Sequence, residues 1–211
     1  MMNWKQLISA KRFGMEEFHE ERQENRSEFQ RDYDRLIFSA PFRRLQNKTQ
    51  VFPLPGSVFV HNRLTHSLEV ASVGRSLGDD VAKALLERHP ELQDSFLPEI
   101  GSIVSAACLA HDLGNPPFGH SGEKAISTFF SEGKGVRLKE KQPNGEQLSP
   151  MEWEDLTHFE GNANAFRILT HQFEGRRKGG FVLTYTTLAS IVKYPFSSSL
   201  AGTCLLYTSD A

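Results

Sequence analysis

The sequence predicts an all-α protein, and three observations favour this class. Residues 62–89 and 99–113 carry apolar side chains at the spacing of a helix. Capping and breaking residues, such as Asn62 and Pro90, bound these segments as they bound helices. Segments with the alternation of a strand are scarce, and residues 58–60 are the best candidate for a short one. The chain of 211 residues therefore suits one helical domain.

The first third of the chain is predicted to hold a surface helix followed by a turn. Residues 11–36 are dense in charges of both signs with aromatic residues between them, which is typical of a helix with a modest apolar stripe. Residues 39–41 break this helix, and a new element starts at Phe42. Residues 51–56 contain two prolines and a glycine, which together predict a turn.

Each of the two long helices is expected to turn a histidine toward the core. At 100° per residue, His66 shares one face of its helix with a set of apolar residues. These residues are Val70, Val73, Leu77, Val81 and Ala84. On the second helix, the residues that share a face with His111 are Ile100, Val104, Ala107 and Cys108. Both histidines are therefore predicted to lie on a buried side, and Asp112 directly follows the second one.

Loops and shorter helices are expected to follow. Residues 114–119 contain two glycines and two prolines and cannot be helical, so a helix restarts near Ser121. Residues 131–150 are polar and rich in turn residues, and we expect an exposed excursion there in the form of a short hairpin. Helices return over residues 159–173 and again over residues 184–194, where a proline ends the last one.

The composition excludes several classes of protein. Lys and Arg number 24 and Asp and Glu 26, so the net charge of −2 argues against a domain-wide basic field for nucleic acid. Two cysteines, Cys108 and Cys204, exclude a disulfide framework and a four-cysteine zinc site. No apolar run approaches the ~18 residues of a membrane span, and the N-terminus has no apolar signal core. We expect a soluble, cytoplasmic protein without membrane association.

His66, His111 and Asp112 are the first candidates for chemistry. Imidazole and carboxylate groups together suit Mn²⁺, Fe²⁺, Zn²⁺ or Mg²⁺, and two inward helix faces can converge on one ion. The simpler interpretation is that each histidine is a hydrogen-bonded core residue, which we would favour for a lone histidine on an apolar face. Two such faces, one of them followed by an aspartate, shift the balance toward a metal site.

His120 and Glu123 form a second candidate group. They lie three residues apart at the start of a predicted helix, where a carboxylate can hold an imidazole in one tautomer and raise its pKa. This pair suits acid/base catalysis beside a metal. The alternative is structural: Ser121 caps the helix and Glu123 merely occupies its favourable first turn.

Several ordered segments together resemble one family. Residues 63–70 (RLTHSLEV) with His111 and Asp112 resemble the His-Asp (HD) superfamily of metal phosphohydrolases. The wider set is residues 31–35 (RDYDR), 42–52 (FRRLQNKTQVF), 62–67 (NRLTHS), 111–123 (HDLGNPPFGHSGE), 158–163 (HFEGNA) and Phe166–Arg167. In this order, over residues 3–196, the segments resemble the deoxyguanosine triphosphate triphosphohydrolase (dGTPase, dNTP triphosphohydrolase) family. The resemblance implies the HD-domain helical phosphohydrolase fold.

The resemblance also implies a reaction and a cofactor. Members of this family split a dNTP into deoxynucleoside and inorganic triphosphate by attack of water on the α-phosphorus, with a divalent metal such as Mg, Mn or Fe. It implies that His66, His111 and Asp112 are metal ligands and that His120, backed by Glu123, handles the proton. It further implies a dNTP as the binding partner and a homo-oligomer at full length.

Three more residues acquire roles only through the resemblance. Arg63 is expected to bind a phosphate, since a guanidinium pairs with two oxygens at once; otherwise it is a surface ion-pair residue. Gln50 resembles a sugar-binding glutamine, and its alternative is an exposed loop amide. His158 resembles a second histidine that contacts the phosphates, and its alternative is a residue that merely flanks the N-terminus of a helix.

The domain organisation departs from the family near the C-terminus. Residues 1–196 match the N-terminal part of the HD domain, whereas residues 197–211 have no clear period or caps and are expected to be foreign to it. The family's fourth ligand, a second aspartate, has no candidate after Tyr194 except Asp210 in this tail. We therefore expect weak metal binding and little hydrolysis from this chain alone.

Two alternative functions stay open at this point. Another HD phosphohydrolase, such as a nucleotide phosphodiesterase or a 5′-nucleotidase, would share the three metal ligands but would not require residues 48–51 or the His120–Glu123 pair. A non-catalytic module for nucleotide effectors or single-stranded DNA is favoured by a concentration of positive charge in one stretch. That stretch contains Arg31, Arg35, Arg43, Arg44 and Lys48.

Overall fold

The computed structural model describes residues 3–17, 26–48, 61–175, 178–194 and 196–198. These residues form helices without a β-sheet, and the one β-type contact among them is an isolated bridge between Arg12 and Thr184. The α-helices are α1 (Trp4–Leu7), α2 (Glu28–Ile37), α3 (Ala40–Arg44), α4 (Arg63–Arg88), α5 (Ile100–Ala110), α6 (His120–Ser131), α7 (Pro150–Thr157), α8 (Gly161–Thr170) and α9 (Tyr185–Ile191). Short 3₁₀ helices are η1 (Leu45–Asn47), η2 (Pro90–Leu92), η3 (Leu97–Glu99) and η4 (Lys134–Lys139). The all-α prediction is confirmed.

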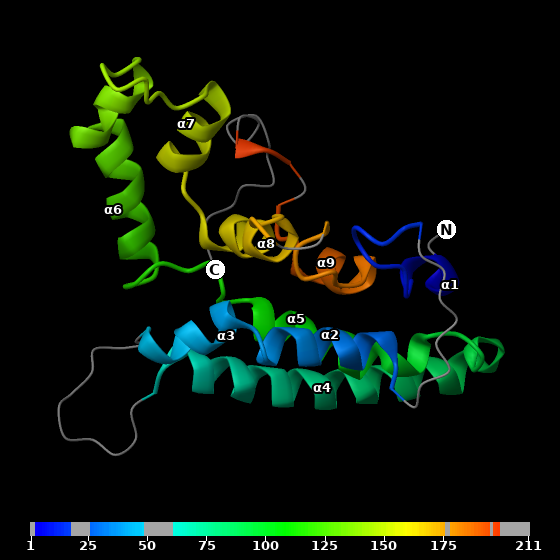
Figure 1. Cartoon of the computed structure of the whole chain (residues 1–211). Coiled ribbons are helices and arrows are strands. Elements are labelled where there is room, and N and C mark those ends of the chain that lie inside the picture. The colour runs from blue at the N-terminus through cyan, green and yellow to red at the C-terminus, as the bar shows by residue number, and fades with distance from the viewer. Residues whose placement is uncertain (1–2, 18–25, 49–60, 176–177, 195, 199–211) are drawn as a thin grey trace.

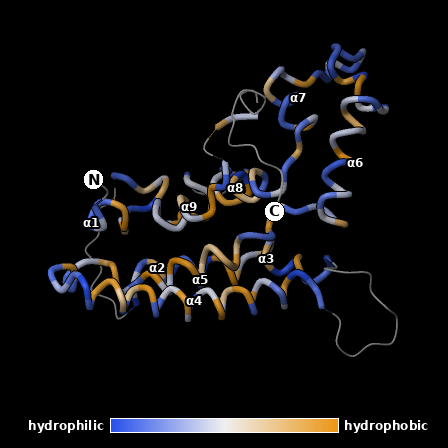
Figure 2. The backbone as a smooth tube through the Cα atoms, turned by 180° about the vertical axis from the view of Figure 1, so that it is seen from behind, coloured by the Kyte–Doolittle hydropathy of each residue, from blue (hydrophilic) through white to orange (hydrophobic). Residues whose placement is uncertain are grey.

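The long helix α4 forms one side of the molecule, and α5 packs along it (Figure 1). The chain turns back through η2 and η3, so that α5 returns along α4 toward its N-terminal end. Helix α2 lies against α5, α9 covers α5 from the other side, and α6 and α7 project away from this body (Figure 1). Helix α5 is thus the central element, which explains why it is the most apolar of the long helices (Figure 2).

Two apolar clusters stabilise this arrangement. The larger one joins α2, α3, α5 and α8, with Leu36, Phe42, Leu109 and Leu169 at its centre. The smaller one lies where α2 meets η3 and α5 and contains Ile8, Phe29, Leu97 and Ile103. The larger cluster includes Leu113, which lies directly after Asp112, so the candidate site is attached to the best-packed part of the molecule.

The buried face of α4 is not the one that the sequence predicted. Val73, Leu77 and Val81 are 60%, 61% and 50% exposed, so the apolar face expected to point inward faces outward. The buried residues are instead Arg63, Ser67, Ala71, Gly74, Gly78 and Ala82. A Cβ atom at Gly78 would lie 2.7 Å from Gly101 Cα, which shows that α4 and α5 approach too closely for larger side chains. The prediction for α5 is wrong in the same way. Ile100, Val104, Ala107 and Cys108, which share a face with His111, are only half-buried, whereas the residues on the opposite side of α5 are buried.

Other segments also differ from the expected elements. Residues 11–17 form turns, and the described helix within the expected 11–36 segment begins only at Glu28. In residues 131–150 the chain reverses through η4 and a turn rather than through a hairpin of strands. Helix α7 was not predicted, although Ser149 and Glu152 form a capping box around a proline at its first position. The expected turn at 51–56, the strand at 58–60 and most of the 197–211 tail lie outside the described residues.

A buried polar network fastens the N-terminal segment to α2 and α9. The Arg12 guanidinium donates to Asp32 Oδ1 at 2.7 Å and to the Val182 carbonyl at 2.6 Å. The other carboxylate oxygen of Asp32 accepts from the Thr184 backbone amide at 2.9 Å and from its hydroxyl at 2.6 Å. Asp32 is fully buried, so these hydrogen bonds compensate the loss of its hydration. Among the described helices, none combines the length and the apolar character that crossing a bilayer requires.

Candidate metal centre and active site

Two helices bring His66, His111 and Asp112 together. His66 lies in the first turns of α4, whose start is fixed by a capping box between Asn62 and Thr65. His111 and Asp112 follow the last residue of α5, on the turn that leads into the Gly/Pro loop. The ligand atoms of the three side chains lie within 4.8 Å of one another, and the two imidazole ring centres are 5.3 Å apart. The structure thus assembles the three residues that the sequence singled out.

His111 is oriented so that one ring nitrogen is free for a ligand. Its Nδ1 lies 2.6 Å from the Cys108 carbonyl oxygen, which can only accept, so Nδ1 carries the proton and donates. The lone pair is therefore on Nε2, which lies 3.6 Å from Asp112 Oδ2. A metal-binding histidine commonly has its second nitrogen held in this way.

Asp112 presents one unpaired oxygen to the same point. Its Oδ1 accepts from Arg63 Nη1 at 2.8 Å and from the Asn115 side-chain amide. Its Oδ2 is buried and has no hydrogen-bond partner among the described residues. A buried carboxylate oxygen without a partner is costly, whereas a divalent cation would satisfy it. The donor set of two imidazoles and one carboxylate therefore fits a divalent metal ion.

Positive charge surrounds this carboxylate. Arg63 is 7% exposed, so its pair with Asp112 is a buried ion pair rather than the surface pair considered as the alternative. Lys48 donates from Nζ to the Asn115 carbonyl oxygen at 2.8 Å. Burial first, and then the nearby charge of Arg63, lower the pKa of Lys48. The sequence placed Lys48 in a basic stretch and Asn115 in the loop after Asp112, but only the fold reveals that the two meet beside Asp112.

His120 and Glu123 form the hydrogen-bonded pair that their spacing predicted. His120 Nδ1 lies 2.8 Å from Glu123 Oε2, and the imidazole is otherwise 98% exposed. Of the structural alternative, one part is wrong and one is observed: the N-cap of α6 is Gly119 and not Ser121, but Glu123 does lie in the first turn of the helix. Glu123 has a second contact: its Oε1 accepts from the Gly161 amide at 2.9 Å, which attaches α6 to the start of α8. The carboxylate is therefore fixed on both sides.

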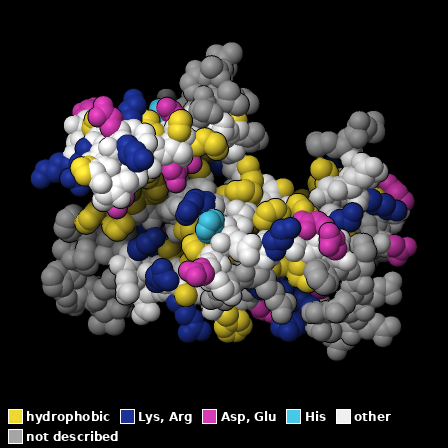
Figure 3. Space-filling model, turned by 45° about the horizontal axis from the view of Figure 1, so that its top comes forward, with side chains coloured by type: hydrophobic (Ala, Val, Ile, Leu, Met, Phe, Trp, Pro, Cys, Tyr) yellow, Lys and Arg dark blue, Asp and Glu magenta, His cyan; other side chains and the backbone are white. Residues whose placement is uncertain are grey.

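Gly119 brings this pair next to Arg63. Its φ of +54° belongs to the left-handed region that glycine adopts without strain. A Cβ at this position would lie 3.4 Å from Arg63 Nη2, so the backbone that precedes His120 runs beside the guanidinium. Figure 3 shows several Lys and Arg side chains, and an acidic one, near a histidine at the middle of the molecule.

The remaining predicted residues are not brought into this group. His158 is the C-cap of α7, is exposed, and makes its contacts with Glu154 and Thr157 of its own helix. The structural alternative expected His158 to flank the N-terminus of a helix; it lies three residues before α8 begins, but its contacts are those of the C-terminal end of α7. Gln50 lies outside the described residues.

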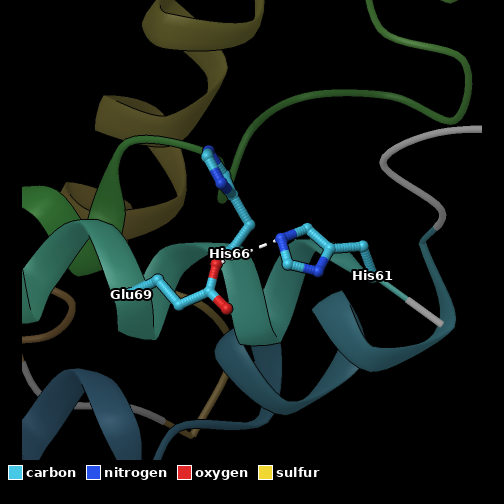
Figure 4. Close-up of side chains that lie close together, drawn as sticks. All are labelled: His61, His66 and Glu69. Atoms are coloured by element: carbon cyan, nitrogen blue, oxygen red, sulfur yellow. Dashed lines mark ion pairs between the residues drawn. The ribbon is translucent and has the colours of Figure 1, made fainter. Parts of the chain in front are cut away.

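A second cluster of metal-binding side chains shares His66. It consists of His61, His66 and Glu69, whose ligand atoms also lie within 4.8 Å of one another. His61 precedes α4 and its ring faces the Glu69 carboxylate, with 3.1 Å between Nε2 and Oε2, while His66 rises from the helix beside them (Figure 4). Sequence reasoning missed this cluster, although His61, His66 and Glu69 lie within nine residues of one another.

Comparisons with known proteins agree with this geometry. Residues 63–180, more than half of the chain, match the HD domain family. A deoxyguanosinetriphosphate triphosphohydrolase-like protein of Synechocystis sp. is 50% identical over 93% of this chain and 43% of its own length. A protein of the same name from Pseudomonas aeruginosa is 48% identical over 93% of this chain and 42% of its length.

A third relative carries a more specific name. The deoxyguanosinetriphosphate triphosphohydrolase of Yersinia enterocolitica is 38% identical over 92% of this chain and 41% of its own length. The chain thus spans about two fifths of the length of these relatives. The matched residues include His66, His111 and Asp112 together with the His120–Glu123 pair. The chain therefore belongs to the HD domain family and is similar, over nearly all of its length, to dGTP triphosphohydrolase-like proteins.

Proposed function

We propose that this chain forms part of a metal-dependent phosphohydrolase that cleaves dGTP or another dNTP to the deoxynucleoside and inorganic triphosphate. The observation that carries the proposal is Asp112 Oδ2, a buried carboxylate oxygen without a hydrogen-bond partner among the described residues. It lies 3.6 Å from the unprotonated nitrogen of His111, and His66 completes the donor set. The names of the relatives support the choice of substrate.

The three ligands would hold Mg²⁺, Mn²⁺ or Fe²⁺, and such an ion supplies Lewis-acid activation of a phosphoryl oxygen and of water. Arg63 has the geometry to bind a phosphate, since one Nη is fixed on Asp112 and the other is directed toward the Gly119 backbone. Lys48 adds a second positive charge on the same side. Both cations offset the charge that develops on phosphoryl oxygens.

His120 is assigned the proton transfer. Because Nδ1 is hydrogen-bonded to Glu123, Nε2 is the nitrogen free to give or take a proton. Glu123 fixes the tautomer of the imidazole, and its bond to the Gly161 amide keeps the carboxylate in place. The exposure of His120 leaves it accessible to a substrate that approaches along the Gly119 backbone.

The first experiment measures binding with the chain itself. Mn²⁺ affinity and metal-dependent binding of dGTP are measured by calorimetry for the wild type, Asp112→Asn and Arg63→Ala. We expect Asp112→Asn to weaken Mn²⁺ binding, and Arg63→Ala to weaken dGTP binding by about 2–5 kcal/mol while Mn²⁺ still binds. Equal dGTP binding by the wild type and Arg63→Ala would contradict the role given to Arg63.

The second experiment measures turnover in a chimera. Residues 3–198 replace the matching segment of the Yersinia relative, and the products of dGTP hydrolysis are separated by ion chromatography. Deoxyguanosine with triphosphate supports the proposal, whereas dGMP with diphosphate or dGDP with phosphate would assign a different phosphohydrolase reaction. In the same chimera His120→Ala should lower kcat by about 10²–10⁴-fold with little effect on metal affinity.

A further inference from the structure

We propose a second divalent-cation site, formed by His61, His66 and Glu69, that competes with the set His66–His111–Asp112 for the same ion through His66. The two sets are called the outer set and the inner set here. The outer set lies on the solvent side, with His61 57% and Glu69 58% exposed, whereas Asp112 of the inner set is buried. The chemistry of the outer set, two imidazoles and one carboxylate, suits Zn²⁺ or another divalent transition metal.

The geometry of the outer set fits one ion. Ligand atoms bound at about 2.1 Å to a tetrahedral ion lie roughly 3.4 Å apart. His61 Nε2 and Glu69 Oε2 are 3.1 Å apart, which is close to that separation, and the His66 nitrogen lies within 4.8 Å of both. His66 and Glu69 are three residues apart on α4 and therefore on one side of it, so a rotation of side chains closes the remaining distance.

His66 makes the two sets alternatives. A neutral imidazole carries a proton on one ring nitrogen and a lone pair on the other, so His66 can bind an ion in only one set at a time. The electrostatics of the sets differ, because Arg63 is paired with Asp112 in the inner set while no Lys or Arg is paired with Glu69 among the described residues. An ion arriving from solvent thus meets exposed His61 and Glu69 before it reaches buried Asp112.

The test is a set of Zn²⁺ titrations by calorimetry, with the visible absorption of Co²⁺ as a second readout of ligand number and geometry. The wild-type chain should bind one ion. His111→Ala removes the inner set and should still bind one ion, with an altered Co²⁺ spectrum. Adding His61→Ala or Glu69→Gln to His111→Ala should weaken Zn²⁺ binding by about tenfold or more, since even outer-shell partners of a ligand contribute 10–100-fold.

The control is a similar pair that lacks a third ligand. His89 and Glu91 are also exposed and lie 3.2 Å apart, but they belong to no metal-binding group among the described residues. His89→Ala with Glu91→Gln, placed in the His111→Ala background, should leave Zn²⁺ affinity unchanged. All five substituted positions are on the surface or half-buried, and circular dichroism verifies the fold of each variant.

The outcomes separate this inference from the proposed function. If His111→Ala abolishes Zn²⁺ binding, or if His61→Ala leaves the binding by His111→Ala unchanged, the outer site does not exist. If His61→Ala alone abolishes binding while His111→Ala has no effect, the outer site stands and the inner set fails as the metal centre. Two ions bound at once to the wild type would refute the competition for His66.

Discussion

Replacing Gly78 with alanine sets helix propensity against packing in the middle of α4. On propensity alone, alanine stabilises a helix interior by about 1 kcal/mol relative to glycine. The added Cβ, however, would lie 2.7 Å from Gly101 Cα, 3.0 Å from Gly101 N and 3.1 Å from the Ile100 carbonyl oxygen. These are backbone atoms of α5 and cannot rotate away, so α4 and α5 must separate.

Overpacking of this kind destabilises a protein by about 1–3 kcal/mol, and packing should outweigh propensity. We therefore expect Gly78→Ala to lower the free energy of unfolding by up to about 2 kcal/mol, the packing cost less the gain in propensity. The neighbouring change Leu77→Ala should lower it by no more than about 1 kcal/mol, because Leu77 is 61% exposed.

Urea unfolding followed by circular dichroism measures all three proteins, and Leu109→Ala serves as the reference for a buried leucine. Leu109 is fully buried, and its truncation should cost about 2–5 kcal/mol. A Gly78→Ala variant more stable than the wild type would refute the close approach of α4 and α5. A Leu77→Ala variant as unstable as Leu109→Ala would show that the apolar face of α4 is buried after all.

Three further predictions concern charge and burial elsewhere. Asp32→Ala should destabilise the protein by about 1–3 kcal/mol in urea unfolding, since it removes the acceptor of the buried Thr184 amide while Arg12 keeps its ion pair with Glu28. Half-buried Asp34, which pairs with exposed Arg26, should cost under about 1 kcal/mol when replaced by alanine. Hydrogen bonds from the Ser149 backbone amide and hydroxyl lower the pKa of Glu152 in the folded protein. The stabilisation that ionised Glu152 gives to α7 is therefore fully present above the pKa of Glu152 in the unfolded chain, and it is lost as the pH falls through the lower pKa of the folded protein. The protection factors of the α7 amides, which compare their exchange with the intrinsic rate at each pH, should fall on acidification, and in Glu152→Gln they should not follow this titration. Burial raises the pKa of the Cys108 thiol, so at pH 8 its alkylation, followed by mass spectrometry, should be slower in the folded than in the urea-unfolded chain.

Local signals in the sequence were sufficient for the starts of two helices, α4 and α9. Asn62 and Thr65 mark the start of α4 and Thr184 marks the start of α9, because a capping interaction spans only three or four residues. The same kind of signal at Ser149 and Glu152 marks α7, so that helix was predictable and was missed. Capping depends on neighbours in the chain, and this is why it can be read without the fold.

The buried face of α4 was not predictable in the same way. Hydrophobic periodicity selects the face with the largest apolar side chains, and on α4 that face is exposed at Val73 and Leu77. The buried face consists of small residues such as Gly74 and Gly78, which carry almost no hydropathy signal. Their role exists only because α5 approaches closely, a relation between segments about 25 residues apart in the chain.

The residues of the candidate site also fall into two groups, those that local sequence signals identify and those that only the fold reveals. Residue type and spacing identify His66, His111 and Asp112, because few groups other than imidazole and carboxylate bind divalent metals. Spacing also identifies the His120–Glu123 pair, since its members meet across one helical turn. Contacts between elements that are distant in sequence, such as Lys48 with Asn115, become visible only in the fold.

Asp112 was identified from the sequence, but the partners of its two carboxylate oxygens are visible only in the fold. Its two carboxylate oxygens have different partners: Oδ1 accepts from Arg63 and Asn115, while Oδ2 is buried beside His111 Nε2. An ion on Oδ2 therefore does not have to displace Arg63 from Oδ1, and the same carboxylate can hold a cation and orient a guanidinium at once. The other guanidinium nitrogen of Arg63, Nη2, lies beside the backbone of Gly119, the residue that directly precedes His120. The proposed ligand set, the proposed phosphate-binding cation and the proposed proton-transfer group are thus linked through one buried side chain, so a change at Asp112 should disturb all three, whereas a change at His120 should disturb only the last.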